Sequence, residues 1–148
     1  MWKAMDKDRR REVALAFLGS VSDKSERKAV TGLIAAKLKF RPQFAAKLPD
    51  DKAAGYLAGL LDIDELMAGT ILRAYLFGAK LPMLAMFLDS LGIDHDKGAI
   101  KADNVPPPTK EGLEAAMEKL RAAFPPADVE LYKEALLTSD PETWVNLE

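Results

Sequence analysis

The chain of 148 residues contains no cysteine and a single histidine, and both shortages restrict its chemistry. Without cysteine there is no thiolate nucleophile, no disulfide scaffold, and no cysteine-ligated zinc site or iron–sulfur cluster. Catalysis that uses histidine would depend on His95 alone, and no serine stands in the G-x-S-x-G motif of a nucleophile elbow. The absence of cysteine also fits a reducing compartment, and we expect a cytoplasmic protein.

Motifs for phosphate, metal and export are missing as well. No glycine-rich loop follows a predicted strand, so nucleotide binding of the P-loop or Rossmann kind has no support. The DHDKG segment at 94–98 lacks the glutamate that closes an EF-hand calcium loop, and two aspartates around one histidine are too few ligands for a zinc site. Residues 1–13 are charged where a secretory signal peptide is apolar. We therefore expect no metal, no cofactor and no export signal.

Strand-like alternation is nearly absent, whereas heptad-like apolar spacing recurs along the chain and predicts an all-α protein. The composition, 49% hydrophobic and 30% charged, is that of a globular protein. We expect a single compact helical domain over residues 1–148, a bundle of about six or seven helices around a central apolar helical hairpin. The sequence becomes irregular at about 93–108, where Ile93 and Ile100 flank a turn-like tip and predict a brief hairpin.

Several helix boundaries are marked by residues with known capping preferences. Asp23, Asp50 and Asp62 each precede an apolar run and are predicted N-caps, the first and last with a glutamate three residues later. Arg41 precedes a proline, and a residue before proline is pushed out of the helical region, so one helix is predicted to end there.

The most apolar stretch is LMAGTILRAYLFGAKLPMLAMFL at 66–88, in which Arg73 and Lys80 are the only charged residues. It predicts two helices, apolar nearly all the way round, that meet at Gly78 and Pro82. Two cations, a glycine and a proline inside this stretch argue against a membrane span, because a cation at the centre of a bilayer costs about 2.5–3.5 kcal/mol on insertion scales. Such helices belong in a core or at an interface.

The leading hypothesis is a non-enzymatic protein-interaction or structural module that forms a homodimer or binds another protein. The alternative is a small-ligand-binding protein or enzyme with a pocket near 93–108, which Arg73 or His95 would face as an anion or ligand contact. For the leading hypothesis, the candidate interface consists of apolar residues from the second half of the hairpin: Met83, Leu84, Met86, Phe87 and Leu88.

Charge is distributed unevenly along the chain. Residues 1–49 have twelve Lys and Arg against five Asp and Glu, a balance of +7, whereas residues 50–148 have nine against eighteen, a balance of −9. A basic half can contact phosphate backbones, so nucleic-acid binding is a second alternative. The isoelectric point near 5.5 disfavours it. The candidate phosphate contacts are Arg9, Arg10, Arg11, Lys37, Lys39 and Arg41.

Overall fold

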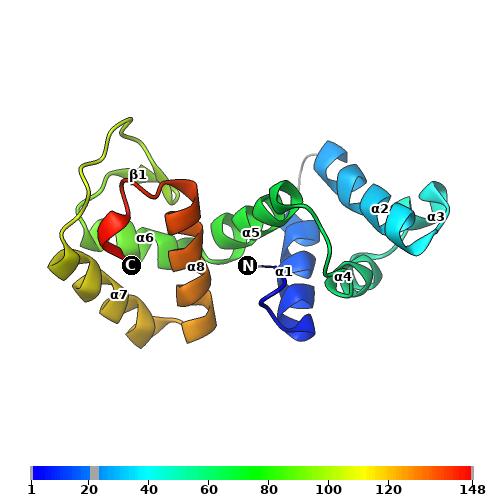
Figure 1. Ribbon diagram of the computed structural model, residues 1–148, viewed down its shortest axis with the longest axis horizontal. Coiled ribbons are helices and arrows are strands. Elements are labelled where there is room, and N and C mark those ends of the chain that lie inside the picture. The colour runs from blue at the N-terminus through cyan, green and yellow to red at the C-terminus, as the bar shows by residue number, and fades with distance from the viewer. Residues whose placement is uncertain (1, 21–23, 148) are drawn as a thin grey trace. The chain divides into compact units, whose positions relative to one another are not determined.

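The computed structural model describes residues 2–20 and 24–147 and confirms the all-α class (Figure 1). It has eight α-helices in its described part, one or two more than the number expected, and is 69% helical. The chain divides into two compact units, residues 1–79 and residues 80–148, which are described separately. The single domain over 1–148 therefore stays a prediction.

Unit 1 contains five helices, and α1 packs against both α4 and α5, while α2 packs against α3 and α4 (Figure 1). Small side chains permit this close packing: Ala53, Ala54 and Ala58 are fully buried on α4. At the end of α5, a Cβ added to Gly78 would lie 3.4 Å from the Ser20 Cβ of α1. The helices of unit 1 are α1 (Lys7–Ser20), α2 (Lys24–Leu38), α3 (Pro42–Ala46), α4 (Asp50–Ala58) and α5 (Glu65–Ala79).

Two long polar side chains connect the N-terminal part of unit 1 to the end of α4. The Trp2 indole N–H donates a hydrogen bond to the Leu60 carbonyl over 2.7 Å, and the ring is 3% exposed. Arg10 donates from Nε to the Ala58 carbonyl over 2.7 Å and from Nη1 to the Met5 carbonyl. These bonds satisfy carbonyls at the C-terminus of α4, where a helix leaves acceptors without partners.

The N-termini of the helices only partly follow the predicted caps. Asp64 caps α5, accepting a hydrogen bond from the Met67 N–H over 2.7 Å, so the prediction of Asp62 is wrong by two residues. Asp50 begins α4 after Pro49 and accepts from Arg27 over 2.6 Å instead of capping the helix. The predicted cap Asp23 lies outside the described residues.

Helix α2 ends three residues before the boundary predicted at Arg41. The helix ends at Leu38, Lys39 has a left-handed φ of +58°, and the Phe40 N–H donates to the Ala35 carbonyl over 3.0 Å. This is the Schellman arrangement, which usually has glycine at the left-handed position. A side chain such as that of Lys39 costs about 1–2 kcal/mol there.

Unit 2 has its own core, formed by α6 (Leu81–Ser90), α7 (Lys110–Ala123), α8 (Pro126–Ser139) and the C-terminal 3₁₀ helix η1 (Val145–Leu147). The Phe87 ring lies at its centre, 5.3 Å from Tyr132 and 5.7 Å from Trp144 between ring centroids. Lys80 Nζ lies 3.0 Å from Asp128 Oδ2, and this ion pair joins the start of α6 to the first turn of α8. The two halves of the apolar stretch thus contribute to different cores: α5 to unit 1 and α6 to unit 2.

The predicted hairpin between Ile93 and Ile100 is confirmed. Strands β1 (His95–Asp96) and β2 (Ala99–Ile100) pair antiparallel. Lys97 and Gly98 form the two-residue turn with φ values of +50° and +84°, as a type I′ turn requires. The chain then runs without helix or strand to Thr109, whose side chain caps α7 by accepting a hydrogen bond from the Gly112 N–H. The connection at 93–108, which was expected to be irregular, therefore begins with a regular hairpin.

No single helix in the described ranges is long and apolar enough to cross a membrane; only α5 and α6 taken together, across their bend, reach that length and composition.

Candidate functional site

The two residues predicted to contact a small ligand, His95 and Arg73, belong to different units and are described separately. His95 is held by its own hairpin: its Nδ1 accepts a hydrogen bond from the Gly98 N–H over 3.1 Å, and its Nε2 lies 2.8 Å from Asp89 Oδ1. A ring that accepts at Nδ1 carries its proton at Nε2 and donates it to Asp89. Arg73 is exposed on α5, in the other unit. The pocket that either side chain would face stays a prediction.

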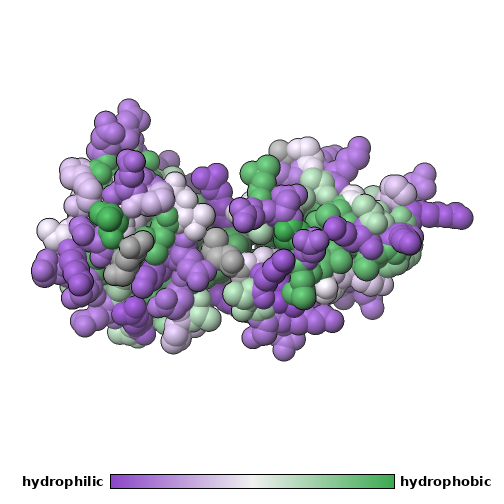
Figure 2. Space-filling model, viewed as in Figure 1, coloured by the Kyte–Doolittle hydropathy of each residue, from purple (hydrophilic) through white to green (hydrophobic). Residues whose placement is uncertain are grey.

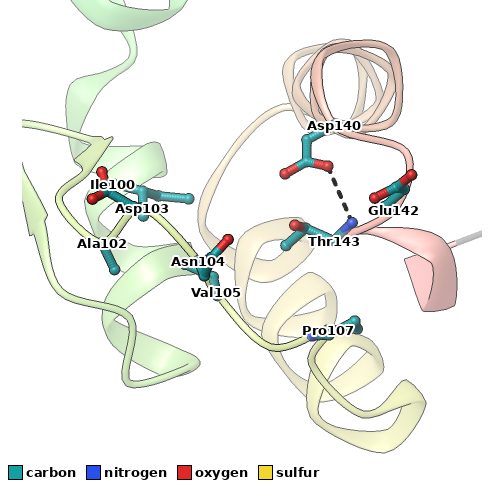
Figure 3. A pocket seen from close by; sticks show the side chains of 9 residues that line it. All are labelled: Ile100, Ala102, Asp103, Asn104, Val105, Pro107, Asp140, Glu142 and Thr143. Carbon is teal, nitrogen blue, oxygen red and sulfur yellow. Dashed lines mark hydrogen bonds between the residues drawn. The ribbon is translucent and has the colours of Figure 1, made fainter.

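A cleft of about 380 Å³ does lie beside the 93–108 connection, between residues 100–107 and the turn after α8 (Figure 3). Asp103, Asp140 and Glu142 line it, and neither His95 nor Arg73 does. Asp140 is held locally, because hydrogen bonds from the Thr143 hydroxyl and backbone N–H keep the pKa of its carboxyl below the usual value. No group of His, Asp or Glu in the described part of the chain could hold a metal ion.

The buried polar side chains of the described residues have hydrogen-bond partners. Burial raises the pKa of the Tyr132 phenol, so this group stays protonated at neutral pH.

The predicted phosphate contacts fall into two groups. Arg10 is 7% exposed and donates to backbone carbonyls, which leaves little of its guanidinium surface for a phosphate. Arg9 Nη1 donates to the Tyr75 hydroxyl over 2.9 Å and lies 3.2 Å from Glu12 Oε2, which commits it to unit 1. The remaining predicted contacts are exposed: Arg11, Lys37, Lys39 and Arg41.

The predicted interface on α6 is mostly core. Met83 and Phe87 have no exposed surface, and Leu84 and Leu88 are each 1% exposed. These four side chains fill the interior of unit 2, because α7 packs against α6 and the Phe87 ring contacts Tyr132 of α8 and Trp144. Met86, 37% exposed, is the only one of the five candidates at the surface. The burial of the other four accounts for the apolar character of this helix without a partner, and the interface on α6 stays a prediction.

Three aromatic rings gather instead on the surface of unit 1, where α2, α3 and α4 meet. Phe40 packs edge-on against Phe44 and against Tyr56, with centroid distances of 5.3 Å and 5.1 Å. Phe44 is nonetheless 53% exposed and Tyr56 is 37% exposed. Edge-to-face rings stabilise one another, so these rings form an ordered apolar platform that is open to solvent.

Cations surround this platform. Lys39 and Arg41 flank Phe40, Lys47 follows Phe44 by one helical turn, and Lys52 precedes Tyr56 by one turn of α4. All four are exposed, and no ion pair found among the described residues includes any of them. In Figure 2, apolar and hydrophilic side chains interleave over α2, α3 and α4. We call this region the aromatic–basic surface; it consists of Lys39, Phe40, Arg41, Phe44, Lys47, Lys52 and Tyr56.

The sequence alone pointed to three of these seven residues, Lys39, Arg41 and Lys47 of the basic half, and did not point to the rings. One signal was present: between Glu26 and Asp50 the sequence has six cations and no acid. The aromatic residues did not stand out, because Phe40 and Tyr56 are sixteen positions apart and meet only after α4 folds back on α2. No known protein family, curated protein or solved structure matches this chain.

Proposed function

We propose that the protein is a non-enzymatic interaction module that binds a protein partner through the aromatic–basic surface. The observation that carries the proposal is the cluster of Phe40, Phe44 and Tyr56 at the surface, next to exposed cations that no ion pair found among the described residues includes. Aromatic residues and arginine are enriched in the centres of protein interfaces, where a few of them supply most of the binding free energy.

The geometry favours this function over catalysis or small-ligand binding. A ligand pocket is concave and mostly apolar, with a few polar groups directed into it. The cleft beside residues 100–107 has three carboxylates among its nine lining residues, four of which are apolar, whereas the most exposed phenylalanine of the chain belongs to the aromatic–basic surface. The exposed apolar side chain best suited to contact a partner is therefore on the aromatic–basic surface of unit 1.

The test compares which proteins are captured by the chain and by two surface variants after chemical cross-linking in a cell extract. Phe44→Ser removes the most exposed ring of the surface, and Leu66→Ser removes an apolar side chain that is 83% exposed on α5. We expect a set of proteins captured equally by the unmodified chain and by Leu66→Ser but depleted about tenfold by Phe44→Ser. Equal capture by all three would refute the proposal.

Size-exclusion chromatography with light scattering on the unmodified chain and its variants measures self-association. A homodimer that dissociates in Phe44→Ser would identify a second copy of the chain as the partner. A homodimer that persists in Phe44→Ser but dissociates in Met86→Ser would instead support the interface on α6 and would contradict the proposed surface.

A further inference from the structure

We infer that the partner segment is acidic and carries aromatic or leucine anchors, so that its anchors cover the rings and its carboxylates meet the surrounding cations. This inference rests on the proposed function and specifies the chemistry of the partner. It follows from three properties of the aromatic–basic surface: the exposure of its rings, the sign of its charge, and the backbone conformation that positions one of its cations.

The apolar centre requires apolar anchors. Phe40 contacts both other rings, which limits the motion of all three and leaves the outer faces of Phe44 and Tyr56 available. Ordered aromatic side chains lose little conformational entropy when a partner covers them. Unit 1 has no strand among its described residues, so recognition here depends on side chains and not on strand addition.

The positive charge of the four cations around the rings calls for carboxylates on the partner. Unlike Arg27, which is paired with Asp50 at 2.6 Å, the four cations of the surface have no acid assigned to them in the described structure. Complementary charge at the rim of an interface accelerates association and excludes partners of the wrong sign. The surface therefore selects acidic segments and disfavours basic ones.

Lys39 provides a separate argument. Its φ of +58° is a conformation that glycine adopts readily and lysine does not. A glycine would stabilise the end of α2, yet the position holds a cation next to the Phe40 ring. Residues held in strained conformations concentrate at binding sites, and the lysine here adds a charge to the rim at a cost in stability.

Nucleic acid is the competing ligand, and the structure favours it less. Affinity for a phosphate backbone grows with the number of cations that reach it. Of the predicted contacts, Arg10 is buried, Arg9 is bound within unit 1, and Lys37 Nζ lies 3.9 Å from Asp62 Oδ2. Exposed aliphatic side chains near this end of α2, Leu38 at 37% and Leu61 at 50%, match apolar anchors better than nucleobases.

The experiment measures binding of fluorescein-labelled probes to the full chain by fluorescence anisotropy. The first probe peptide alternates Asp and Glu with Phe and Leu; two matched peptides replace its acids by Gln or its apolar residues by Ser, and the fourth probe is a single-stranded oligothymidine. We expect the first peptide to bind at least about tenfold tighter than the other three probes, and its affinity to fall as salt is raised.

Variants separate binding from folding. Phe44→Ser and Lys47→Glu should each weaken binding of the first peptide about tenfold, whereas Leu66→Ser and Lys110→Glu, which lie outside the surface, should leave it unchanged. Lys39→Gly should raise the midpoint of urea unfolding and still weaken binding about threefold. Because this variant is more stable, its loss of affinity cannot come from misfolding.

Three outcomes would overturn the inference. One is stronger binding of the oligothymidine, with Lys47→Glu abolishing it. Another is equal binding of the acidic and glutamine peptides, which would mean that the rim does not select charge. The third is no binding of any peptide; if proteins from the extract are still captured in a Phe44-dependent manner, the proposed function stands and only the acidic class of partner is wrong.

Discussion

Gly92 and Gly98 both have positive φ, at +67° and +84°, but their surroundings differ. A Cβ at Gly98 would lie 3.0 Å from Cδ2 and 3.1 Å from Cβ of Leu84, a side chain that is itself 1% exposed. A Cβ at Gly92 would meet nothing within 4 Å. Substitutions of these two glycines therefore separate two contributions to the loss of stability: the strain of a left-handed backbone and the crowding of an added Cβ.

We predict that Gly98→Ala lowers the free energy of unfolding by about 2–4 kcal/mol, since the new methyl group adds overpacking against Leu84 to the strain of a left-handed backbone. Gly92→Ala should cost about 1–2 kcal/mol, from the backbone alone. Urea unfolding followed by circular dichroism provides both values. Equal losses in the two variants would show that α6 moves to accept the methyl group.

The different surroundings of single neighbouring residues also explain why the candidate site was hard to predict from the sequence. Arg9, Arg10 and Arg11 are identical neighbours in the sequence, yet one contacts Tyr75, one is buried against backbone carbonyls and one is exposed. Successive helix positions point in directions about 100° apart, so the fate of each depends on what packs against α1. That information comes from α4 and α5: Ala58 is 48 positions after Arg10, and Tyr75 is 66 positions after Arg9.

At the scale of elements, Arg10 is the side chain that joins α1 to the C-terminus of α4. Replacing it with Met keeps the apolar stem but leaves the Ala58 carbonyl without its donor. A buried acceptor without a partner costs about 1–3 kcal/mol, and we predict that loss for Arg10→Met. Arg11→Met, at an exposed position of the same helix, should change the free energy of unfolding by less than about 0.5 kcal/mol.

Urea unfolding monitored by Trp2 fluorescence, with Trp144→Phe present in both variants, measures this difference directly. A loss in Arg10→Met no larger than that in Arg11→Met would mean that water replaces the guanidinium at the Ala58 carbonyl, and that α1 and α4 are held by apolar packing alone.

Local signals predicted the elements well wherever proline or glycine fixed the backbone. Pro42 begins α3, Pro82 lies in the first turn of α6, and the hairpin at 93–100 has its Lys-Gly turn. Caps were less well predicted, because Asp62 and Asp64 both suit the role and the choice depends on where α5 packs. An apolar pattern shows that a helix is buried without showing what buries it, which is why α5 and α6 were expected in one hairpin.

At the scale of the whole molecule, each unit has a separate core and one buried tryptophan: Trp2 in unit 1, 3% exposed, and Trp144 in unit 2, 2% exposed. Variants with a single tryptophan, Trp144→Phe and Trp2→Phe, therefore report the unfolding of one unit at a time. Leu120 is fully buried in unit 2 and Val13 is fully buried in unit 1.

We predict that Leu120→Ala, by removing about 2–5 kcal/mol of packing free energy, lowers the urea midpoint reported by Trp144 more than that reported by Trp2. Val13→Ala should have the opposite pattern, with a smaller shift. If both reporters shift together in both variants, residues 1–148 unfold cooperatively, as the single domain predicted from the sequence requires.

The bond between the Trp2 indole and the Leu60 carbonyl also makes the chain its own sensor. It holds a fluorophore against the end of α4, the helix that presents Tyr56 to solvent. In the Trp144→Phe variant, a ligand seated on that helix would change the emission of Trp2, whereas in the Trp2→Phe variant the emission of Trp144 would stay the same. The location of a bound molecule can thus be read in ordinary buffer from intrinsic light, without attaching any dye to the protein.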